Sequence, residues 1–133
     1  ILNSKVKFRE WYRPFAPFCK KEEAHKYFDS PNFENLEYMS YAPKVKVDTL
    51  PSITHIDGTA RLQTVTKESH SDFYELLTEF GKISETNVLL NTSFNIRGYP
   101  ILSTIEDALY ALNNTDMDHV VIEDYLFTKR EVQ

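Results

Sequence analysis

Large apolar residues recur three or four positions apart in two stretches of the chain. In SDFYELLTEFGK (residues 71–82), four of them between Phe73 and Phe80 keep this spacing, which predicts one face of an amphipathic helix. Ser71 suits the N-cap of that helix, and Gly81 suits its C-terminal stop. We therefore predict a helix here, and the same spacing returns nearer the C-terminus.

This second helix is predicted over STIEDALYALNN (residues 103–114). Thr104 suits its N-cap, and Asp107 three residues later gives a pattern close to a capping box. A shorter helix, rich in good helix formers, is predicted over KEEAHKYFD (residues 21–29). Pro31 bars its continuation, so a loop is expected after it.

Short runs that are apolar, or that alternate between apolar and polar residues, predict the strands. Pro43 makes the first of these runs an edge or broken strand. Helices and strands interleave, which predicts an α/β (α+β) domain with a mixed sheet and flanking helices. The predicted strands are YMSYAPKVKV (38–47), the runs Ile53–Ile56 and Ala60–Val65 on either side of Asp57-Gly58, NVLLN (87–91), HVVIED (119–124) and YLFTKR (125–130).

Length and composition suit a soluble protein. The 133 residues fit one domain with one hydrophobic core, and the 41% apolar and 26% charged residues are ordinary for a globular domain. No apolar run is long enough to cross a bilayer, and the N-terminus lacks the apolar segment of a signal peptide. There is no starting Met, so we interpret residues 1–133 as a single domain cut from a longer chain.

The chain has one cysteine, Cys19, which cannot form an internal disulfide. A reducing, cytoplasmic location is therefore expected. Its surroundings, PFCKKEE, offer two lysines but no nearby histidine. This favours a buried small apolar residue over a catalytic nucleophile.

Charge is unevenly distributed. Residues 1–20 carry five basic residues against Glu10 alone, giving +4, and because the whole chain has a net charge of −5, the other 113 residues sum to −9. A nucleic-acid surface would need a basic face across the domain, so binding of nucleic acid is not expected. The pattern suits either a small anion held by a few basic groups or a basic tail that only keeps the chain soluble.

The first stretch with candidate chemistry is KFREWYRPFAP (residues 7–17). Lys7, Arg9 and Arg13 lie within seven residues and would share one face of an extended chain. Arginine binds phosphate in a bidentate manner and lysine binds it as a point charge, so this cluster predicts a phosphate site. The alternative is that these long side chains cover the edge of the core.

The second stretch is THIDGTAR (residues 54–61), in which Asp57-Gly58 predicts a tight turn. Thr54, His55, Thr59 and Arg61 crowd around this turn. An ordinary hairpin would explain the pattern equally well. For His55 we favour a stacking surface or a core imidazole over a catalytic base.

The third stretch is LLNTSFNIRGYP (residues 89–100), where a predicted strand runs into a polar loop. Backbone N–H groups at such a junction, together with Ser93, Asn95 and Arg97, predict an anion cradle, and Gly98 would permit a backbone path that a Cβ would block. The alternative is a capped turn that leads to the next helix. Arg13, Arg61 and Arg97 come one from each of the three stretches, so their convergence would create a phosphate site.

The sequence shows no metal site and no familiar nucleotide motif. The four histidines are isolated, without the spacing of HExxH or CxxC. There is no GxGxxG and no Walker A loop. A nucleotide, if one binds, would be held by a different type of cradle.

Taken together, KFREWYRPFAP, ITHIDGTARLQTV and VLLNTSFNIRGYPILSTIEDAL resemble the C-terminal domain of the O-carbamoyltransferases, a family that includes nodulation-factor and antibiotic-tailoring enzymes. The blocks stand in family order, cover nearly the whole chain and enclose FYELLTEFG, the expected helix between the second and third. The resemblance implies a YrdC-like fold, a twisted mixed sheet with flanking helices. The family commonly has Ser where Phe18 stands and an acidic residue where Tyr99 stands.

The resemblance also implies a reaction in two steps. A YrdC-like domain combines carbamoyl phosphate and ATP into carbamoyl-adenylate by way of carbamate, with Mg²⁺ accompanying the nucleotide. An N-terminal Kae-like domain of the same chain, which holds iron or a similar metal, then transfers the carbamoyl group to an acceptor hydroxyl. This partner domain is absent from residues 1–133, so the sequence does not identify the acceptor.

The family's basic residues correspond to Lys7, Arg13, Arg61 and Arg97, which by resemblance hold carbamoyl phosphate and the nucleotide phosphates and are the expected catalytic residues. We assign no metal ligand. The expected substrate- and nucleotide-binding positions are Thr54, His55, Thr59, Ser93, Asn95 and Gly98.

Two other functions stay open. The chain would also suit a stand-alone YrdC-like module that binds nucleotide or RNA without transferase activity, although the −9 charge of residues 21–133 weighs against RNA. It would also suit a domain that mainly docks on its partner domain, in which case an apolar patch should be exposed.

Overall fold

The computed structural model describes residues 2–130. They fall into two compact units. Pro14–Thr92 form the central unit, and the described parts of Ile1–Arg13 and Ser93–Gln133 form the terminal unit. The sequence predicts one domain with one core, which depends on how these two units are arranged. It therefore stays a prediction.

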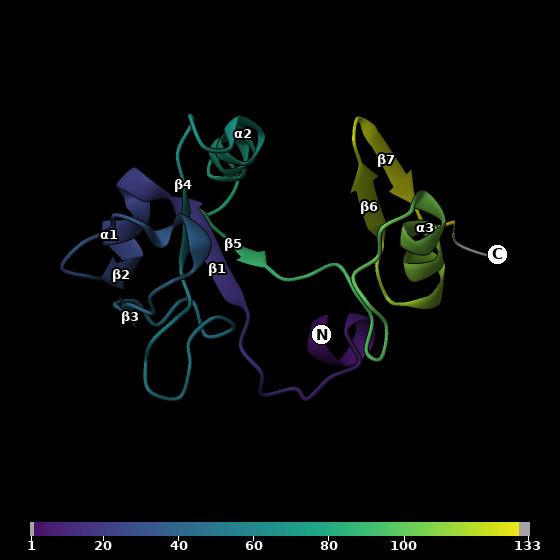
Figure 1. The fold of residues 1–133 in the computed structure, drawn as a ribbon, viewed down its shortest axis with the longest axis horizontal. Coiled ribbons are helices and arrows are strands. Elements are labelled where there is room, and N and C mark those ends of the chain that lie inside the picture. The colour runs from purple at the N-terminus through teal and green to yellow at the C-terminus, as the bar shows by residue number, and fades with distance from the viewer. Residues whose placement is uncertain (1, 131–133) are drawn as a thin grey trace. The chain divides into compact units, whose positions relative to one another are not determined.

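A three-stranded mixed sheet organises the central unit. Its order is β4-β1-β5, with β1 (Ala16–Lys20) in the middle, β4 (Gln63–Val65) parallel to it and β5 (Val88–Asn91) antiparallel (Figure 1). All five residues of β1 are buried, and the strand has a neighbour on each side.

Helix α2 (Ser71–Phe80) contributes to the small core beside this sheet. Phe18, Val65 and Leu77 form a buried cluster, and Leu89 packs against it. The predicted helix is confirmed, but its apolar stripe is only partly buried, since Phe73 stays 52% exposed.

One of the two predicted end signals of α2 is confirmed. Gly81 is the C-cap at which the helix stops, although its φ of −65° is not left-handed. The N-cap prediction is wrong, because His70 occupies that position and Ser71 is the first helical residue. A Cβ at Gly81 would collide with the side chain of Asn87, and we infer that close packing is what requires glycine.

The other elements of the central unit are short. The helix predicted over 21–29 is a 3₁₀ turn (Lys21–Glu23) followed by α1 (Ala24–Tyr27), and it ends early because β2 (Phe28–Asp29) pairs with β3 (Lys44–Val45). A second 3₁₀ turn spans Leu36–Tyr38.

Two strand predictions in this unit are too long, and a third is wrong. The run 38–47 keeps only β3, which is consistent with the break expected at Pro43. The run Ala60–Val65 keeps only β4, and Ile53–Ile56 forms no strand. Thr59 makes a single β-bridge with Lys44, so the predicted hairpin is reduced to its turn.

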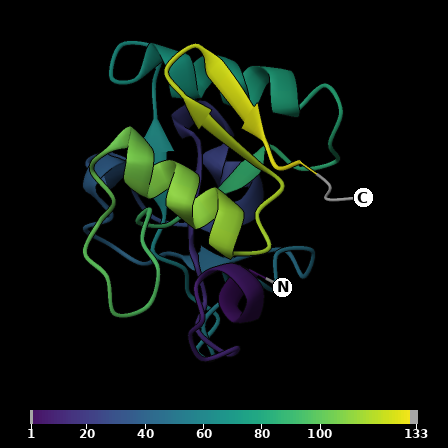
Figure 2. The same ribbon diagram turned by 90° about the vertical axis from the view of Figure 1, so that its right-hand side faces the viewer.

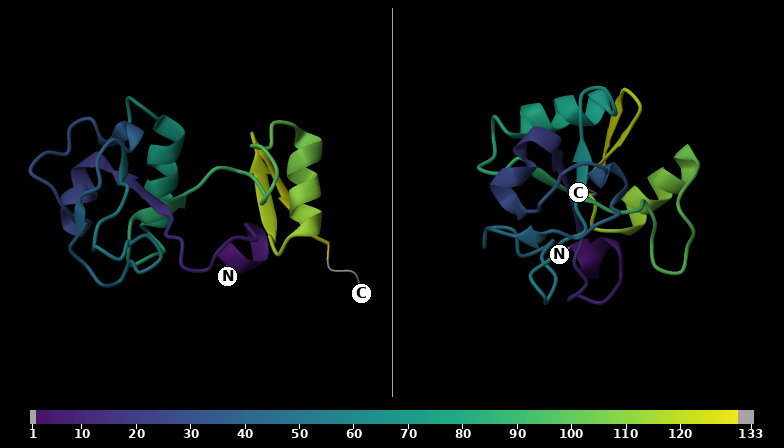
Figure 3. Two further views of the ribbon diagram at one scale, coloured as in Figure 1. Left: turned by 60° about the horizontal axis from the view of Figure 1, so that its bottom comes forward. Right: turned by 60° about the vertical axis from the view of Figure 1, so that its left-hand side comes forward.

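The terminal unit combines the two ends of the chain. A π-helical turn (Leu2–Val6) and α3 (Ile105–Asn114) precede the antiparallel hairpin of β6 (His119–Ile122) and β7 (Tyr125–Thr128), seen in Figure 2. Figure 3 shows α3 alongside this hairpin.

The sequence signals in this unit are confirmed. The hydroxyl Oγ1 of Thr104 accepts a hydrogen bond of 3.1 Å from the backbone N–H of Asp107, so the predicted N-cap of α3 is present. Ala108, Ala111 and Leu112 form its buried side.

The α/β class is therefore confirmed. In the described residues the strands form one mixed three-stranded sheet and two two-stranded sheets, not one continuous sheet. The YrdC-like topology stays a prediction.

Candidate functional site

The ammonium group of Lys7 joins the first basic stretch to the polar loop of the third. Its Nζ donates to the backbone carbonyl of Ser93 and, at 2.6 Å, to Oδ1 of Asn95. The Ser93 hydroxyl lies 3.1 Å from the same Asn95 oxygen. Lys7, which was selected from the sequence, thus meets two other selected residues that lie 86 and 88 positions later, within the terminal unit.

Lys7 is only 6% exposed, which is unusual for a lysine. Burial lowers the pKa of its ammonium group, and the nearby positive charge of Arg9 lowers it further. Two of its three N–H donors are used by Ser93 and Asn95, which leaves one N–H for a ligand. The expectation of an extended chain here is wrong, because a π-helical turn precedes Lys7 and Phe8 has a φ of +50°.

The loop that accepts the hydrogen bonds of Lys7 contains a tight turn. The backbone N–H of Tyr99 donates to the carbonyl of Ile96 at 3.0 Å, and Gly98 at the third position has a φ of +83°. This position of a type II turn requires a positive φ, which explains the glycine. A Cβ on Gly98 would meet no atom within 4 Å, so the expected steric block is wrong and only the backbone conformation matters.

Arg97 lies at the second position of that turn. Its Nη1 is 3.5 Å from the carbonyl oxygen of Phe8, which places its guanidinium beside the N-terminal segment. The side chain is exposed, and most of its five donors are therefore open to a ligand.

Arg13 pairs with Glu10 at 3.6 Å, and both side chains are partly exposed. The pKa of the Glu10 carboxyl is lowered by a hydrogen bond from its own backbone and by the charges of Arg13 and Arg97. Both arginines therefore act on one carboxylate in the terminal unit. Glu10 is a site residue that the sequence analysis did not select.

Asn3 was also missed. Its Nδ2 donates to the carbonyls of Trp11 (3.1 Å) and Arg13 (2.8 Å), and its Oδ1 accepts from Nε of Arg9 at 2.7 Å. These contacts fix the path of the basic stretch. No sequence signal marked this role, since an Asn among Leu2, Ser4 and Lys5 has no distinctive pattern.

The second stretch forms a compact loop in the central unit. The N–H of Gly58, which has a φ of +76°, donates to the His55 carbonyl at 2.9 Å, so the turn predicted at Asp57-Gly58 is confirmed. The Thr59 hydroxyl donates to Oδ1 of Asp57 at 2.7 Å.

The other candidates of this stretch have simple surroundings. The Thr54 hydroxyl donates to the Leu50 carbonyl at 2.8 Å, and His55 Nδ1 lies 3.4 Å from the Thr59 hydroxyl. Arg61 is exposed and makes no hydrogen bond or ion pair with any residue between 2 and 130. Its convergence with the basic groups of the terminal unit stays a prediction.

Cys19 is fully buried, as expected for a small apolar residue. Burial raises the pKa of its thiol to about 12, and the charges of Glu23 and Glu22 act in the same direction. The thiol is therefore a poor nucleophile at neutral pH.

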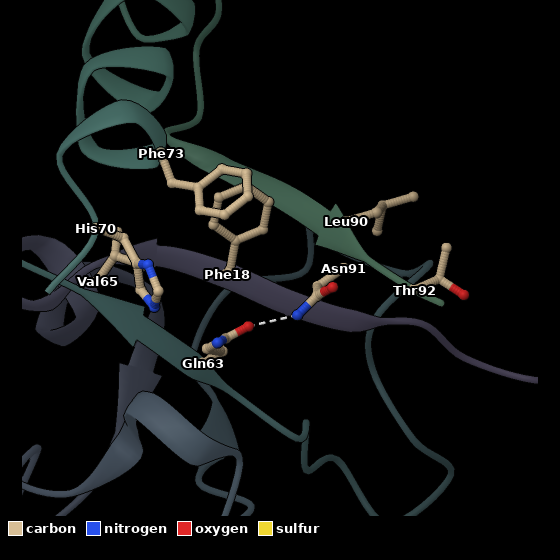
Figure 4. Close-up of a pocket in the computed structure, with 8 residues that line it drawn as sticks. All are labelled: Phe18, Gln63, Val65, His70, Phe73, Leu90, Asn91 and Thr92. Atoms are coloured by element: carbon tan, nitrogen blue, oxygen red, sulfur yellow. Dashed lines mark hydrogen bonds between the residues drawn. The ribbon is translucent and has the colours of Figure 1, made fainter. Parts of the chain in front are cut away.

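A pocket of about 300 Å³ opens at the sheet of the central unit (Figure 4). Three aromatic rings contribute to its wall, and an amide pair stands at one side. The lining residues are Phe18, Gln63, Val65, His70, Phe73, Leu90, Asn91 and Thr92.

Within residues 2–130, no three His, Cys, Asp or Glu side chains come together as metal ligands. No helix in that part of the chain has the length and apolarity needed to cross a membrane.

The terminal unit of this α/β chain places a buried lysine, two arginines and a Ser/Asn loop together, and these are groups that can donate hydrogen bonds to an anion. Sequence comparison gives its family. The model of the family described as "Carbamoyltransferase C-terminus" matches residues 1–129, and the chain belongs to this family.

Individual relatives agree. The chain is 39% identical to nodulation protein NolO of Bradyrhizobium diazoefficiens over 97% of its length, and 33% identical to a 3'-hydroxymethylcephem-O-carbamoyltransferase of Amycolatopsis lactamdurans over 96%. It is also 39% identical to nodulation protein NolNO of Sinorhizobium fredii over 97%. The chain spans only 20–24% of the length of these relatives.

Proposed function

We propose that the chain is the C-terminal domain of an ATP-dependent O-carbamoyltransferase, and that it forms carbamoyl-adenylate from carbamoyl phosphate and ATP. The observation that carries the proposal is the contact of Lys7 with Ser93 and Asn95 in a chain of the carbamoyltransferase C-terminal family. This contact joins two of the three stretches selected for anion binding.

The chemistry requires fixed positive charge. Water takes the phosphoryl group of carbamoyl phosphate, which releases phosphate and carbamate. A carbamate oxygen then attacks the α-phosphorus of ATP, and the bond to pyrophosphate breaks. Two unit charges about 4 Å apart repel each other by roughly 4 kcal/mol at an effective dielectric constant near 20, so bringing two polyanions together needs compensation by cations.

The described residues have groups suited to this task. The remaining N–H of Lys7 provides one rigid point charge, since its other two donors are held by protein oxygens. The guanidinium groups of Arg13, Arg61 and Arg97 are exposed and provide bidentate donors for phosphate oxygens. Thr54, His55, Thr59, Ser93 and Asn95 are proposed as polar contacts to the same ligands, and the Gly98 turn positions Arg97.

The full reaction needs a partner in this proposal. An N-terminal Kae-like domain that holds iron would transfer the carbamoyl group to the acceptor, in the cytoplasm. Mg²⁺ would be bound mainly by the nucleotide phosphates, which is usual for this ion. The names of the relatives support transfer to a hydroxyl group, as in 3'-hydroxymethylcephem, but the acceptor of this protein is not assigned.

Calorimetry with carbamoyl phosphate, and with ATP plus Mg²⁺, tests the proposal on the 133-residue chain. Arg61→Ala should weaken binding by about 10- to 150-fold, because a hydrogen bond to a charged group contributes about 1.5–3 kcal/mol. Arg130→Ala is the matched control, because Arg130 is also exposed and lies outside the three stretches.

If neither ligand binds to the chain, the proposed function is wrong. If both bind but Arg61→Ala and Arg130→Ala behave alike, the role of Arg61 is wrong. Carbamoylation of an acceptor by the chain alone would contradict the proposed division between two domains.

A further inference from the structure

One carboxylate of the terminal unit lies among the groups proposed to bind phosphate. Oε2 of Glu10 is 3.6 Å from Nη1 of Arg13, and the charges of Arg13 and Arg97 both act on this carboxyl group. The two arginines therefore already face an anion that belongs to the protein itself. A phosphate group bound by the same guanidinium groups would have to share them with Glu10 or replace it.

We propose that Glu10 is a competing residue of the phosphate site, whose carboxylate holds the position of a phosphate group beside Arg13 and gives it up when a ligand binds. The inference rests on the proposed function, because it takes Arg13 and Arg97 as groups that bind phosphate. A carboxylate suits this exchange, since arginine pairs with carboxylate and with phosphate oxygens through the same two parallel N–H donors.

The backbone around Glu10 is held in place. The N–H of Arg13 donates to the carbonyl of Glu10 at 3.2 Å, which closes a turn with Trp11 and Tyr12 at its tip. Nδ2 of the buried Asn3 donates to the carbonyls of Trp11 and Arg13 at 3.1 and 2.8 Å. The side chains of Glu10 and Arg13 thus leave one fixed turn, and rotation of the side chains is sufficient to separate them.

The contacts of both arginines are of a kind that exchanges readily. The distance of 3.6 Å between Glu10 and Arg13 is longer than an ordinary hydrogen bond, and the two side chains are 41% and 56% exposed. Exposed ion pairs of this type contribute little to stability. Arg97 is held as loosely, because its Nη1 lies 3.5 Å from the Phe8 carbonyl. A phosphate group has more charge and more terminal oxygens than a carboxylate, so it competes well for these donors.

The charge of Glu10 has a consequence for product release. Its pKa is lowered by a hydrogen bond from its own backbone and by the charges of Arg13 and Arg97, so the carboxyl group stays ionised at neutral pH. The proposed reaction releases phosphate and pyrophosphate in every turnover. A carboxylate that returns to the arginines favours this release, and Glu10 thereby lowers the affinity for phosphates.

Calorimetry of the 133-residue chain with inorganic pyrophosphate, and with carbamoyl phosphate, tests the inference. Glu10→Gln should bind both about two- to fivefold more tightly than wild type, because a neutral amide leaves the arginines more easily than a carboxylate does. Glu106→Gln is the matched control. It removes an exposed carboxylate in the first turn of α3 and should leave both affinities unchanged.

Replacement of Arg13 by Ala separates exchange from simple repulsion. Without Arg13, the carboxylate of Glu10 has lost its ion-pair partner, so Glu10→Gln should give a smaller gain in this background than in wild type. Equal gains in the two backgrounds would mean that Glu10 only repels the ligand, and this result would overturn the inference.

Thermal melting of each variant verifies that it is folded. Unchanged or weaker binding by folded Glu10→Gln would also overturn the inference, and if carbamoyl phosphate binds in that case the proposed function stands. If pyrophosphate shows the expected pattern but neither carbamoyl phosphate nor ATP binds, the proposed function is the part that fails. If no phosphate compound binds to wild type or to Glu10→Gln, both are wrong.

Discussion

Replacement of Lys7 by Met tests the contact on which the proposed function depends. The side chain keeps a similar length but loses both hydrogen bonds, to the Ser93 carbonyl and to Asn95. Hydrogen bonds to charged groups contribute about 1.5–3 kcal/mol each. Part of this is already offset, because burial of the ammonium group is unfavourable and lowers its pKa.

We therefore expect a net loss of about 2 kcal/mol in the free energy of unfolding. For a chain of this size, this corresponds to a decrease of roughly 6–10 °C in melting temperature. Amide hydrogen exchange should locate the change, with faster exchange at the N–H of Leu102, which donates to the Phe94 carbonyl within the same loop.

Lys5→Met is the matched control, since it removes the same charge two residues away. Lys5 forms an exposed ion pair with Asp116 at 3.1 Å, and such pairs contribute about 0–1 kcal/mol. If the two variants melt at the same temperature, or if exchange at Leu102 is unchanged by Lys7→Met, the contact described here does not stabilise the loop.

Three further predictions concern single positions. At pH 8 the Cys19 thiol should react with an alkylating reagent roughly a thousandfold more slowly in the folded chain than in the denatured chain, since its pKa is raised from 9.0 to about 12. Rapid alkylation of the folded chain would contradict its burial. For the same reason, the contribution of Cys19 to the free energy of unfolding should be complete below pH 9 and be lost as pH rises towards 12. Thr104→Ala should lower the unfolding free energy by about 1 kcal/mol through loss of the α3 N-cap, whereas a change of similar size in Ser103→Ala would show that the cap is not the cause. Gly98→Ala should cost about 1–2 kcal/mol because of the positive φ, and Gly98→Asn should cost less in chemical denaturation; equal costs would mean that the turn has another conformation.

Some features of the chain follow from local sequence. Helices α2 and α3 and the β6–β7 hairpin are where the apolar spacing predicts them. The Thr104 cap and the turn at Gly58 are also present, because each depends on atoms only a few residues apart. The three polar stretches, which also carry the family resemblance, are read from the sequence in the same way.

Other features were decided by tertiary contacts. Pairing of Phe28 with Val45 shortened a predicted helix, and the side chain of Asn87 gives Gly81 its role. The apolar spacing predicts α2 but not the burial of each of its residues: Phe73 is left half exposed at a pocket that no periodicity reveals.

The candidate site shows the same division. Local sequence predicts that Lys7, Ser93 and Asn95 belong to anion-binding stretches, but not that the lysine is buried between the other two. That contact needs segments that are distant in sequence. The hydrogen bonds of Asn3 with Arg9, Trp11 and Arg13 need irregular backbone such as the π-helical turn. Hydrophobic spacing encodes the elements because it acts within one or two turns of chain, whereas the burial of a charged or polar side chain depends on whichever partners the folded chain brings to it.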